Sequence, residues 1–253
     1  MKLAESIPFS AELTGPQHTR SYLRAGAAPQ DGEFALDASW GLAAPTDNET
    51  VALAADDLRE FLRLSLGLTL AGGGPAIDLR VDERLGDNPE THLLRMTPEG
   101  VEVVGAGPAG VLHRCFRLQA LMQERGGPIL PIGEERRTPI FQRRIHRSIL
   151  SPFNVEELTG YSGPPLEVKS PGIEWDYPGW REEDAGPDMF YHDNMLMRLA
   201  RHGFNGIWVR GALRVFAKTQ VFPEFGEHAE QIMAQLRRLS ARAARFGIGV
   251  YLY

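Results

Sequence analysis

The sequence predicts an α/β protein in two parts, a small α+β domain over residues 1–137 and a second domain over residues 138–253. In the first part, helix-like and strand-like patterns follow one another without a regular order. In the second part, strand and helix patterns alternate, which is the order typical of parallel βαβ units. The pattern changes near Pro139, which places the boundary between the two domains there.

Composition and charge argue against several classes of function. The 253 residues are 43% hydrophobic and carry a net charge of −6 without a basic stripe, which argues against nucleic acid and anionic membranes as partners. The single cysteine, Cys115, excludes an intrachain disulfide. The first residues lack the apolar core of a signal peptide, and no run of about 18 apolar residues predicts a membrane span. We therefore expect a cytoplasmic protein.

Apolar spacing predicts the elements of the first domain. A helix begins after Asn48 and ends at Gly67, because polar capping side chains precede a helical apolar run and a glycine follows it. Further elements follow in order: a strand at 77–81, a hairpin of 92–96 and 101–104, a helix bearing Val111, Cys115, Leu118 and Met122 on one face, and a short apolar strand at 128–132.

The second domain is predicted as strand, helix, strand, helix, strand. The strands cover residues 144–150, 206–210 and 248–253, and a long polar and aromatic loop follows the first of them. A full (β/α)₈ barrel takes about 250 residues, more than twice the length of this part. The pattern therefore fits either an incomplete barrel or a smaller open sheet.

One short motif favours a different function. Gly105, Gly107 and Gly110 match G-x-G-x-x-G between a strand and a helix, and Glu134 follows where a ribose-binding acid is expected. By this pattern the stretch resembles an FAD-binding fingerprint. The preceding strand, however, is the return arm of a hairpin, and Arg114 stands where such a helix usually packs an apolar residue on the sheet. The simpler interpretation is a tight turn from strand to helix.

The order of the motifs supports a resemblance to a known family. Gly105–Gly110 is followed by Phe116-Arg117-Leu118-Gln119-Ala120-Leu121-Met122-Gln123, by the strand at 128–132, and by Pro139-Ile140-Phe141-Gln142-Arg143-Arg144. Arg201–Trp208 and Arg245–Tyr251 then look like passages from helix to strand. In this order the chain resembles family 20 glycoside hydrolases, the β-N-acetylhexosaminidases, and relatives such as the α-glucuronidases. The resemblance implies an accessory α/β domain over 1–137, and over 138–253 the first three strands of a (β/α)₈ barrel.

The resemblance also implies a carbohydrate substrate and candidate contacts for it. Arg144 matches the family's strand-one arginine, which hydrogen-bonds sugar hydroxyls; a salt bridge at the bottom of the barrel is the alternative. Arg147 and Arg210 lie nearer the carboxyl ends of their strands, where barrel enzymes place their active sites. Trp175 and Trp180 belong to the loop after strand one and are suited to stacking on sugar rings; the alternative is that their burial holds this long loop in place.

The chain differs from the family at the positions where the family carries its substrate-binding and catalytic residues. Hexosaminidases carry a His and paired Asp residues after strand two, where this chain has Trp208-Val209-Arg210-Gly211-Ala212-Leu213-Arg214, so specificity for N-acetylhexosamine is not expected. None of the three strand ends offers a carboxylate, although glycoside hydrolysis requires carboxylic acids. We therefore assign no catalytic residue here and expect the acids beyond residue 253.

Three hypotheses follow from the sequence. The first is a glycoside hydrolase that needs no cofactor, partnered by its sugar and by the rest of the barrel, with self-association expected if the barrel edges are left open. The second is an FAD- or NAD-binding oxidoreductase using the three glycines. The third is a non-catalytic carbohydrate-binding module. The histidines show no metal-binding spacing with acids or Cys115.

Overall fold

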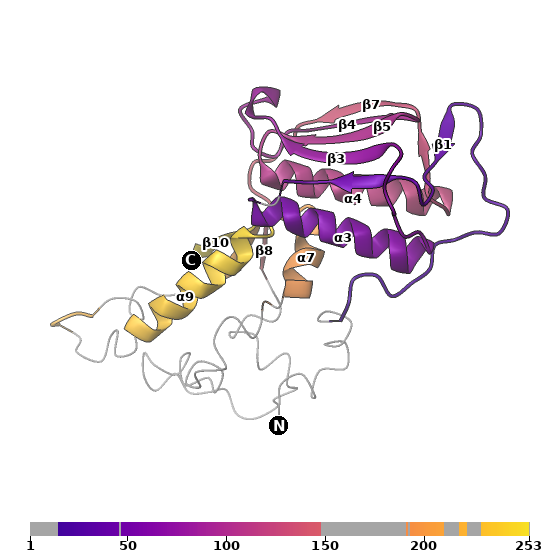
Figure 1. Cartoon of the computed structure of the whole chain (residues 1–253). Helices are drawn as coiled ribbons and strands as arrows, with labels where there is room; N and C mark the ends of the chain where they lie inside the picture. The colour runs from indigo at the N-terminus through magenta and orange to yellow at the C-terminus, as the bar shows by residue number, and fades with distance from the viewer. Residues whose placement is uncertain are drawn as a thin grey trace. The chain divides into compact units, whose positions relative to one another are not determined.

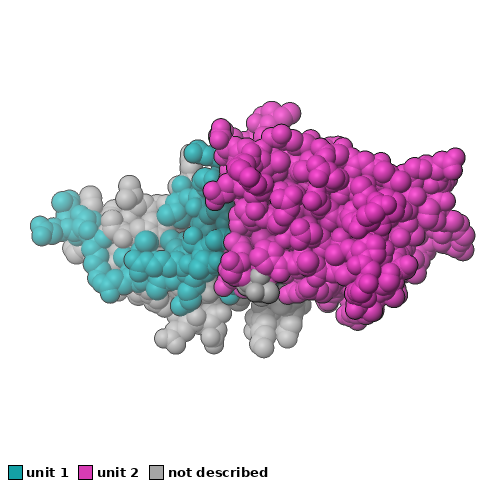
Figure 2. All heavy atoms as spheres, turned by 45° about the horizontal axis from the view of Figure 1, so that its top comes forward, with its two compact units in different colours: residues 1–15, 143–244, 248–253 teal, residues 16–142, 245–247 magenta. Residues whose placement is uncertain are grey.

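The computed structural model describes residues 15–45, 47–147, 191, 193–209, 218–221 and 229–252. The chain divides into two compact units, shown in different colours in Figure 2. One unit consists of residues 16–142 with 245–247, and the other of residues 1–15, 143–244 and 248–253.

A five-stranded mixed sheet forms one layer of the first unit (Figure 1). Its strands, in spatial order, are β2 (Gly41–Ala43), β3 (Ala76–Val81), β5 (Gly100–Gly105), β4 (His92–Thr97) and β7 (Gly133–Arg137). The first three strands run parallel to one another, and both neighbours of the β4 strand run antiparallel to it. The predicted hairpin is thus confirmed as β4 and β5. The β5 strand has an antiparallel neighbour on one side and a parallel one on the other.

Two helices cover one face of this sheet, α3 (Glu49–Leu66) and α4 (Pro108–Arg125) (Figure 1). Asn48 accepts hydrogen bonds from the first turn of α3, and Gly67 ends that helix in a left-handed conformation with φ 63°. Between sheet and helices lies a core of completely buried side chains, including Leu58, Phe61 and Leu79. Burying such side chains is the main stabilising contribution to a unit of this size.

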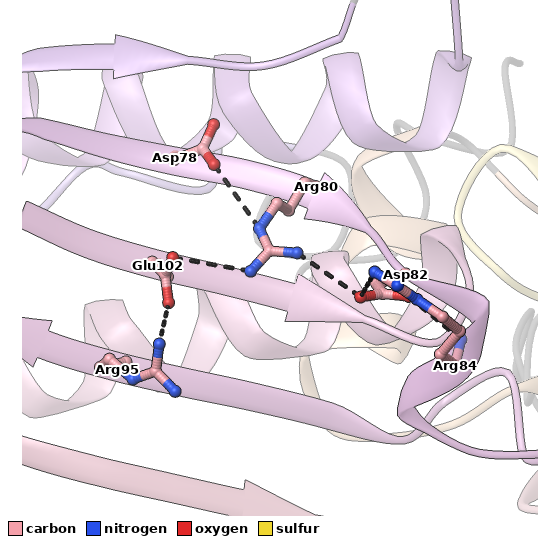
Figure 3. A network of polar contacts seen from close by, with 6 residues as sticks. All are labelled: Asp78, Arg80, Asp82, Arg84, Arg95 and Glu102. Atoms are coloured by element: carbon pink, nitrogen blue, oxygen red, sulfur yellow. Dashed lines mark hydrogen bonds and ion pairs between the residues drawn. The ribbon is translucent and has the colours of Figure 1, made fainter.

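The opposite face of the sheet is charged (Figure 3). Arg95 on β4 lies 2.7 Å from Glu102 on β5, and Arg80 on β3 approaches Asp78, Asp82 and Glu102 within 3.5–3.7 Å. Residues of alternate positions in a strand point to opposite faces, which places these charges outward and Ile77 and Leu79 inward. The outer face of the sheet is therefore a solvated surface on which the charged side chains pair with one another.

Three short elements complete the first unit. β1 (Glu33–Ala35) and β6 (Ile129–Pro131) pair antiparallel in a separate two-stranded sheet. A 3-10 helix, η1 (Glu83–Leu85), follows β3, and the Arg136 guanidinium donates a hydrogen bond to the carbonyl of Leu85. These contacts anchor the connections at the rim of the sheet.

The second unit contains a three-stranded parallel sheet in the order β10-β9-β8. Its strands are β8 (Ile145–Arg147), β9 (Gly206–Val209) and β10 (Gly249–Leu252), and its described helices are α7 (Asp193–Arg201) and α9 (Ala229–Ala244). The strands and helices thus follow the predicted order. The sequence placed the first strand over 144–150, of which 148–150 lie outside the described residues.

The strands β2 and β7 have no counterpart among the predicted elements. The β7 strand reads Gly-Glu-Glu-Arg-Arg and so has no apolar side chain to reveal it. Backbone pairing with β4 places it at the edge of the sheet. Such pairing joins residues about forty positions apart, and a local pattern carries no signal for it.

Candidate functional site

The candidate site is the carboxyl-terminal part of the sheet β8-β9-β10, because parallel α/β folds bind their ligands at that end of the strands. Arg147 on β8 pairs in register with Trp208 on β9, and Trp208 pairs with Tyr251 on β10. Two residues nearer the amino ends of the strands, Ile145, Gly206 and Gly249 are likewise partners in register. They lie on the same face of the sheet as Arg147, Trp208 and Tyr251.

The two faces of this sheet differ in character. Ile207 is completely buried, and it shares its face with His146 and Val250, their partners in register. The His146 ring meets the Phe204 ring edge-on at 5.0 Å, and burial lowers the pKa of His146. These contacts give His146 a packing role. Trp208 and Tyr251 belong to the opposite face and are half-buried.

Tyr251 covers two glycines of the opposite face. A Cβ atom at Gly206 would lie 2.6 Å from the Tyr251 Cε2 atom, and one at Gly249 would lie 3.3 Å from it. The ring therefore lies across the backbone of two neighbouring strands, and a side chain at Gly206 would require the ring to move. Trp208 and Tyr251 were not among the residues predicted for the site. The alternation of β9 and β10 is the signal that identifies them, once the buried Ile207 shows which face is covered.

Arg144 lies at the amino-terminal end of β8. Its amide donates to the Asn205 side-chain oxygen at 2.7 Å, and its carbonyl accepts from the Asn205 amide at 3.1 Å. Its guanidinium Nε donates to the carbonyl of Gly203. Asn205 also accepts from the Gly249 amide at 2.9 Å, so it joins the starting points of all three strands. Arg144 and Arg147 thus stand at opposite ends of β8.

The other predicted contacts are placed only in part. The backbone of Arg147 lies at the carboxyl end of the described β8, in register with Trp208. Arg210 follows directly after β9, and it lies outside the described residues, as do Trp175 and Trp180. For these four residues the sugar contacts stay predictions.

The glycine motif has a structural explanation in the first unit. A Cβ atom at Gly110 would lie 2.8 Å from the Thr91 carbonyl oxygen and 3.0 Å from that of Pro89. A Cβ atom at Gly105 would lie 2.4 Å from the Val111 nitrogen. The Ala106 amide donates to the Thr91 carbonyl at 2.8 Å. The glycines therefore allow the segment 89–91 to pack directly against the turn into α4, and they need no nucleotide to account for them.

Arg114, the residue that does not fit a nucleotide-binding helix, is completely buried. Its guanidinium donates to the carboxylate of Glu135 at 2.9 Å and to the Glu135 carbonyl at 3.0 Å. Burial raises the pKa of Glu135, but hydrogen bonds from Arg117 and Arg114 outweigh that effect and hold the pKa below its usual value. An ionised pair thus anchors β7 on α4.

The described part of the chain contains neither a metal-binding cluster nor a helix suited to span a membrane. No group of three or more His, Cys, Asp or Glu side chains is arranged there to hold a metal ion. None of the described helices is long and apolar enough to span a bilayer.

Comparison with known proteins relates this fold to carbohydrate-active enzymes. No family model and no curated protein matches the sequence. Among solved structures, a GH138 enzyme targeting pectin rhamnogalacturonan II matches with a TM-score of 0.58 and 13% identity. The Streptomyces plicatus β-hexosaminidase matches with a TM-score of 0.52 and 17% identity, and the GH20 β-N-acetylhexosaminidase of Streptomyces coelicolor A3(2) with 0.52 and 16%. The structural neighbours are glycoside hydrolases.

The glycoside hydrolase likeness covers most of this chain and a smaller share of the other proteins. It includes 84% of the chain against the GH138 enzyme and 94% against each hexosaminidase. The chain corresponds to 24% and 46% of those structures, so it spans less than half of their length. At these identities the likeness concerns the fold, a mixed α/β arrangement similar to that of the GH20 hydrolases.

Proposed function

We propose that this chain is the N-terminal portion of a glycoside hydrolase that acts on glycosidic bonds of oligo- or polysaccharides. The observation that carries the proposal is the fold likeness to the Streptomyces plicatus β-hexosaminidase, which extends over 94% of the chain and therefore into both units. The neighbours' own activities are properties of those proteins, and sugar and linkage are left open here.

The domain organisation belongs to the same proposal. Residues 1–137 would be the accessory α/β domain, and residues 138–253 the first three strands of a (β/α)₈ barrel. The parallel order β10-β9-β8, with α7 and α9 between consecutive strands, supports the barrel. Sheet partners beyond β8 and β10 would come from the remaining barrel strands.

The proposed chemistry requires carboxylic acids that the described strand ends do not supply. The described strands end at Arg147, Val209 and Leu252, and none of these is a carboxylate. We place the catalytic acids in the strands that would follow β10. Arg147, Arg210, Trp175 and Trp180 are proposed to contact the sugar from the first part of the barrel. Arg144 belongs to the same set, and its contacts with Asn205 and Gly203 give it a structural role as well.

The test is hydrolysis by the complete protein that contains residues 1–253. A panel of aryl glycosides and plant and bacterial polysaccharides is assayed for released product, and the same preparation is examined for flavin absorbance. Hydrolysis of one sugar class without a flavin band supports the proposal. Sugar binding without turnover would favour the carbohydrate-binding module instead. A bound flavin, or neither binding nor turnover, would overturn the hydrolase proposal.

Two variants separate the roles of the arginines. Arg147→Lys should raise KM for the hydrolysed sugar and leave the melting temperature nearly unchanged, because lysine keeps the charge but loses the fork of donors. Arg144→Lys should lower the melting temperature, because it loses the Nε contact with Gly203. A KM effect of Arg144→Lys alone, without a change in melting, would assign Arg144 to the substrate.

A further inference from the structure

The edge strand β7 is held to the rest of its sheet by an unusual cluster of charges. On the face toward α4, the Glu135 carboxylate lies 2.9 Å from Arg114, 3.5 Å from Arg117 and 4.0 Å from Arg137. One carboxylate therefore serves three guanidinium groups. Two of the Arg114 nitrogens, Nε and Nη1, are buried without a hydrogen-bond partner among the described residues.

His92 completes this cluster from the neighbouring strand. It begins β4 and pairs in register with Arg137, the last residue of β7. Its side chain is buried, and its Nδ1 donates to the Glu90 carbonyl at 2.8 Å. The charged and titratable groups that act on it electrostatically are Arg114 and His113 from α4 and Arg137 from β7.

A proton on His92 would enter surroundings that are already rich in positive charge. Burial, and to a smaller extent the charges of Arg114, His113 and Arg137, lower the pKa of His92 to about 4 against a backbone hydrogen bond that raises it. At neutral pH the ring is neutral, and the positive charges of the cluster are balanced by Glu135 and, at Arg117, also by Glu124 at 3.3 Å. The Glu90 carboxylate lies 3.8 Å from His113 and so engages a different histidine.

We propose that β7 is an acid-sensitive edge strand: the cluster of Glu135 with Arg114, Arg117 and Arg137 holds it at neutral pH, and it is released when the neighbouring His92 takes up a proton. Beyond β7, the Thr138 hydroxyl lies 3.0 Å from that of Thr91, next to His92. Release of β7 is therefore expected to break this contact as well.

The direction of the pH effect follows from the two states of His92. When β7 is released, the ring is hydrated and binds a proton near its ordinary pKa of about 6.5. In the closed state the proton binds only near pH 4. The released state thus holds more protons between these values, and its population rises up to about tenfold for each unit that the pH falls.

The experiment is amide hydrogen exchange of the complete protein that contains residues 1–253, followed by mass spectrometry between pH 7 and pH 5 and corrected for the intrinsic exchange rate at each pH. Wild-type peptides covering residues 133–142 should open about tenfold more often at pH 5 than at pH 6. Peptides covering β3 and β5 should stay protected. His92→Asn, which keeps a donor toward Glu90 but cannot take up a proton, should abolish the pH dependence.

Two further variants make the outcome decisive. Glu135→Gln should expose residues 133–142 to exchange already at pH 7, because it removes the carboxylate that balances the arginines. His202→Asn, at an exposed histidine of the second unit, should behave as the wild type. The proposal is overturned if His92→Asn keeps the wild-type pH dependence, if β7 stays protected in Glu135→Gln, or if β3 and β5 open together with β7.

Discussion

Glu135 on β7 and Arg114 on α4 are joined by an ion pair of 2.9 Å, at a point where the Arg114 side chain has no exposed surface. Removing one partner of a buried ion pair leaves the other charge unpaired in poorly solvated surroundings. We expect Glu135→Gln to lower the free energy of unfolding by about 3 kcal/mol in urea denaturation. Glu102→Gln, in the exposed network of Figure 3, is the matched control and should change it little.

Replacing both members of the pair should be far less harmful than replacing one. Arg114→Met combined with Glu135→Leu removes the one completely buried charge together with its partner. Arg117 and Arg137 also lose Glu135, but both are partly exposed and Arg117 keeps its contact with Glu124. The double variant should therefore recover most of the stability that Glu135→Gln loses. Denaturation curves of the two single variants and the double variant measure this coupling. Strictly additive losses would mean that the two side chains act independently, contrary to their contact.

The turn into α4 gives a second prediction. Gly110→Ala places a methyl group 2.8 Å from the Thr91 carbonyl oxygen, which belongs to backbone that cannot easily move. We expect a loss of about 2 kcal/mol in the free energy of unfolding, as for other overpacked sites. Gly41→Ala is the control, because its added methyl group would meet its nearest atoms at 3.8 Å. Equal stability of both variants would remove the steric explanation of the glycine motif.

The N-terminal segment is predicted to depend on one buried aspartate. Asp57 Oδ1 lies 2.8 Å from His18 Nε2, and Asp57 Oδ2 accepts from Gln119 at 2.6 Å. Asp57→Ala leaves the polar groups of His18 and Gln119 buried without this partner, which should cost about 2 kcal/mol and loosen residues 16–24. Thermal melting and limited proteolysis of that segment measure the two effects.

The adjacent residue provides a control for that substitution. Asp56 is exposed and pairs only with Arg59 among the contacts described, in an i, i+3 arrangement on the surface of α3. Asp56→Ala should therefore leave both the melting temperature and the cleavage pattern close to those of the wild type. If Asp56→Ala and Asp57→Ala behave alike, the buried network does not anchor the segment.

Asn205 is predicted to hold the starting points of the parallel strands together. Asn205→Ala removes the hydrogen bond from the Arg144 amide to the side chain but leaves the backbone contacts with Arg144 and Gly249 in place. We expect a loss of about 1 kcal/mol, with faster amide exchange at β8 than at β10. Unchanged exchange at β8 would show that backbone pairing alone sets the register.

The open sheet edges predict self-association of residues 1–253 when they are prepared alone. Within the described residues, β8 and β10 each pair with a neighbour on one side only, and Ile145 and Leu252 on them are 41% and 51% exposed. Unpaired strand edges with apolar side chains promote association. Sedimentation velocity over a range of concentrations measures it, and Leu252→Lys should reduce it. A monomer at every concentration contradicts the prediction.

The sequence by itself determined the elements whose signal is local. The helices α3 and α4 and the β4–β5 hairpin follow from apolar spacing, caps and turn residues that lie within a few positions of one another. The alternation of strands and helices after Pro139 likewise predicted the parallel sheet. The order of weak motifs was also enough to predict the likeness to glycoside hydrolases that the solved structures display.

The tertiary structure decided what depends on distant residues. It showed that Arg144 stands at the amino end of β8 with Asn205, and that Arg114 fits beneath β7 because Glu135 meets it there. It also showed that Gly110 is needed because Thr91 packs against it. Each of these facts depends on the desolvation, charge or steric contact of side chains brought together by folding, and such energies are not contained in the local order of residues.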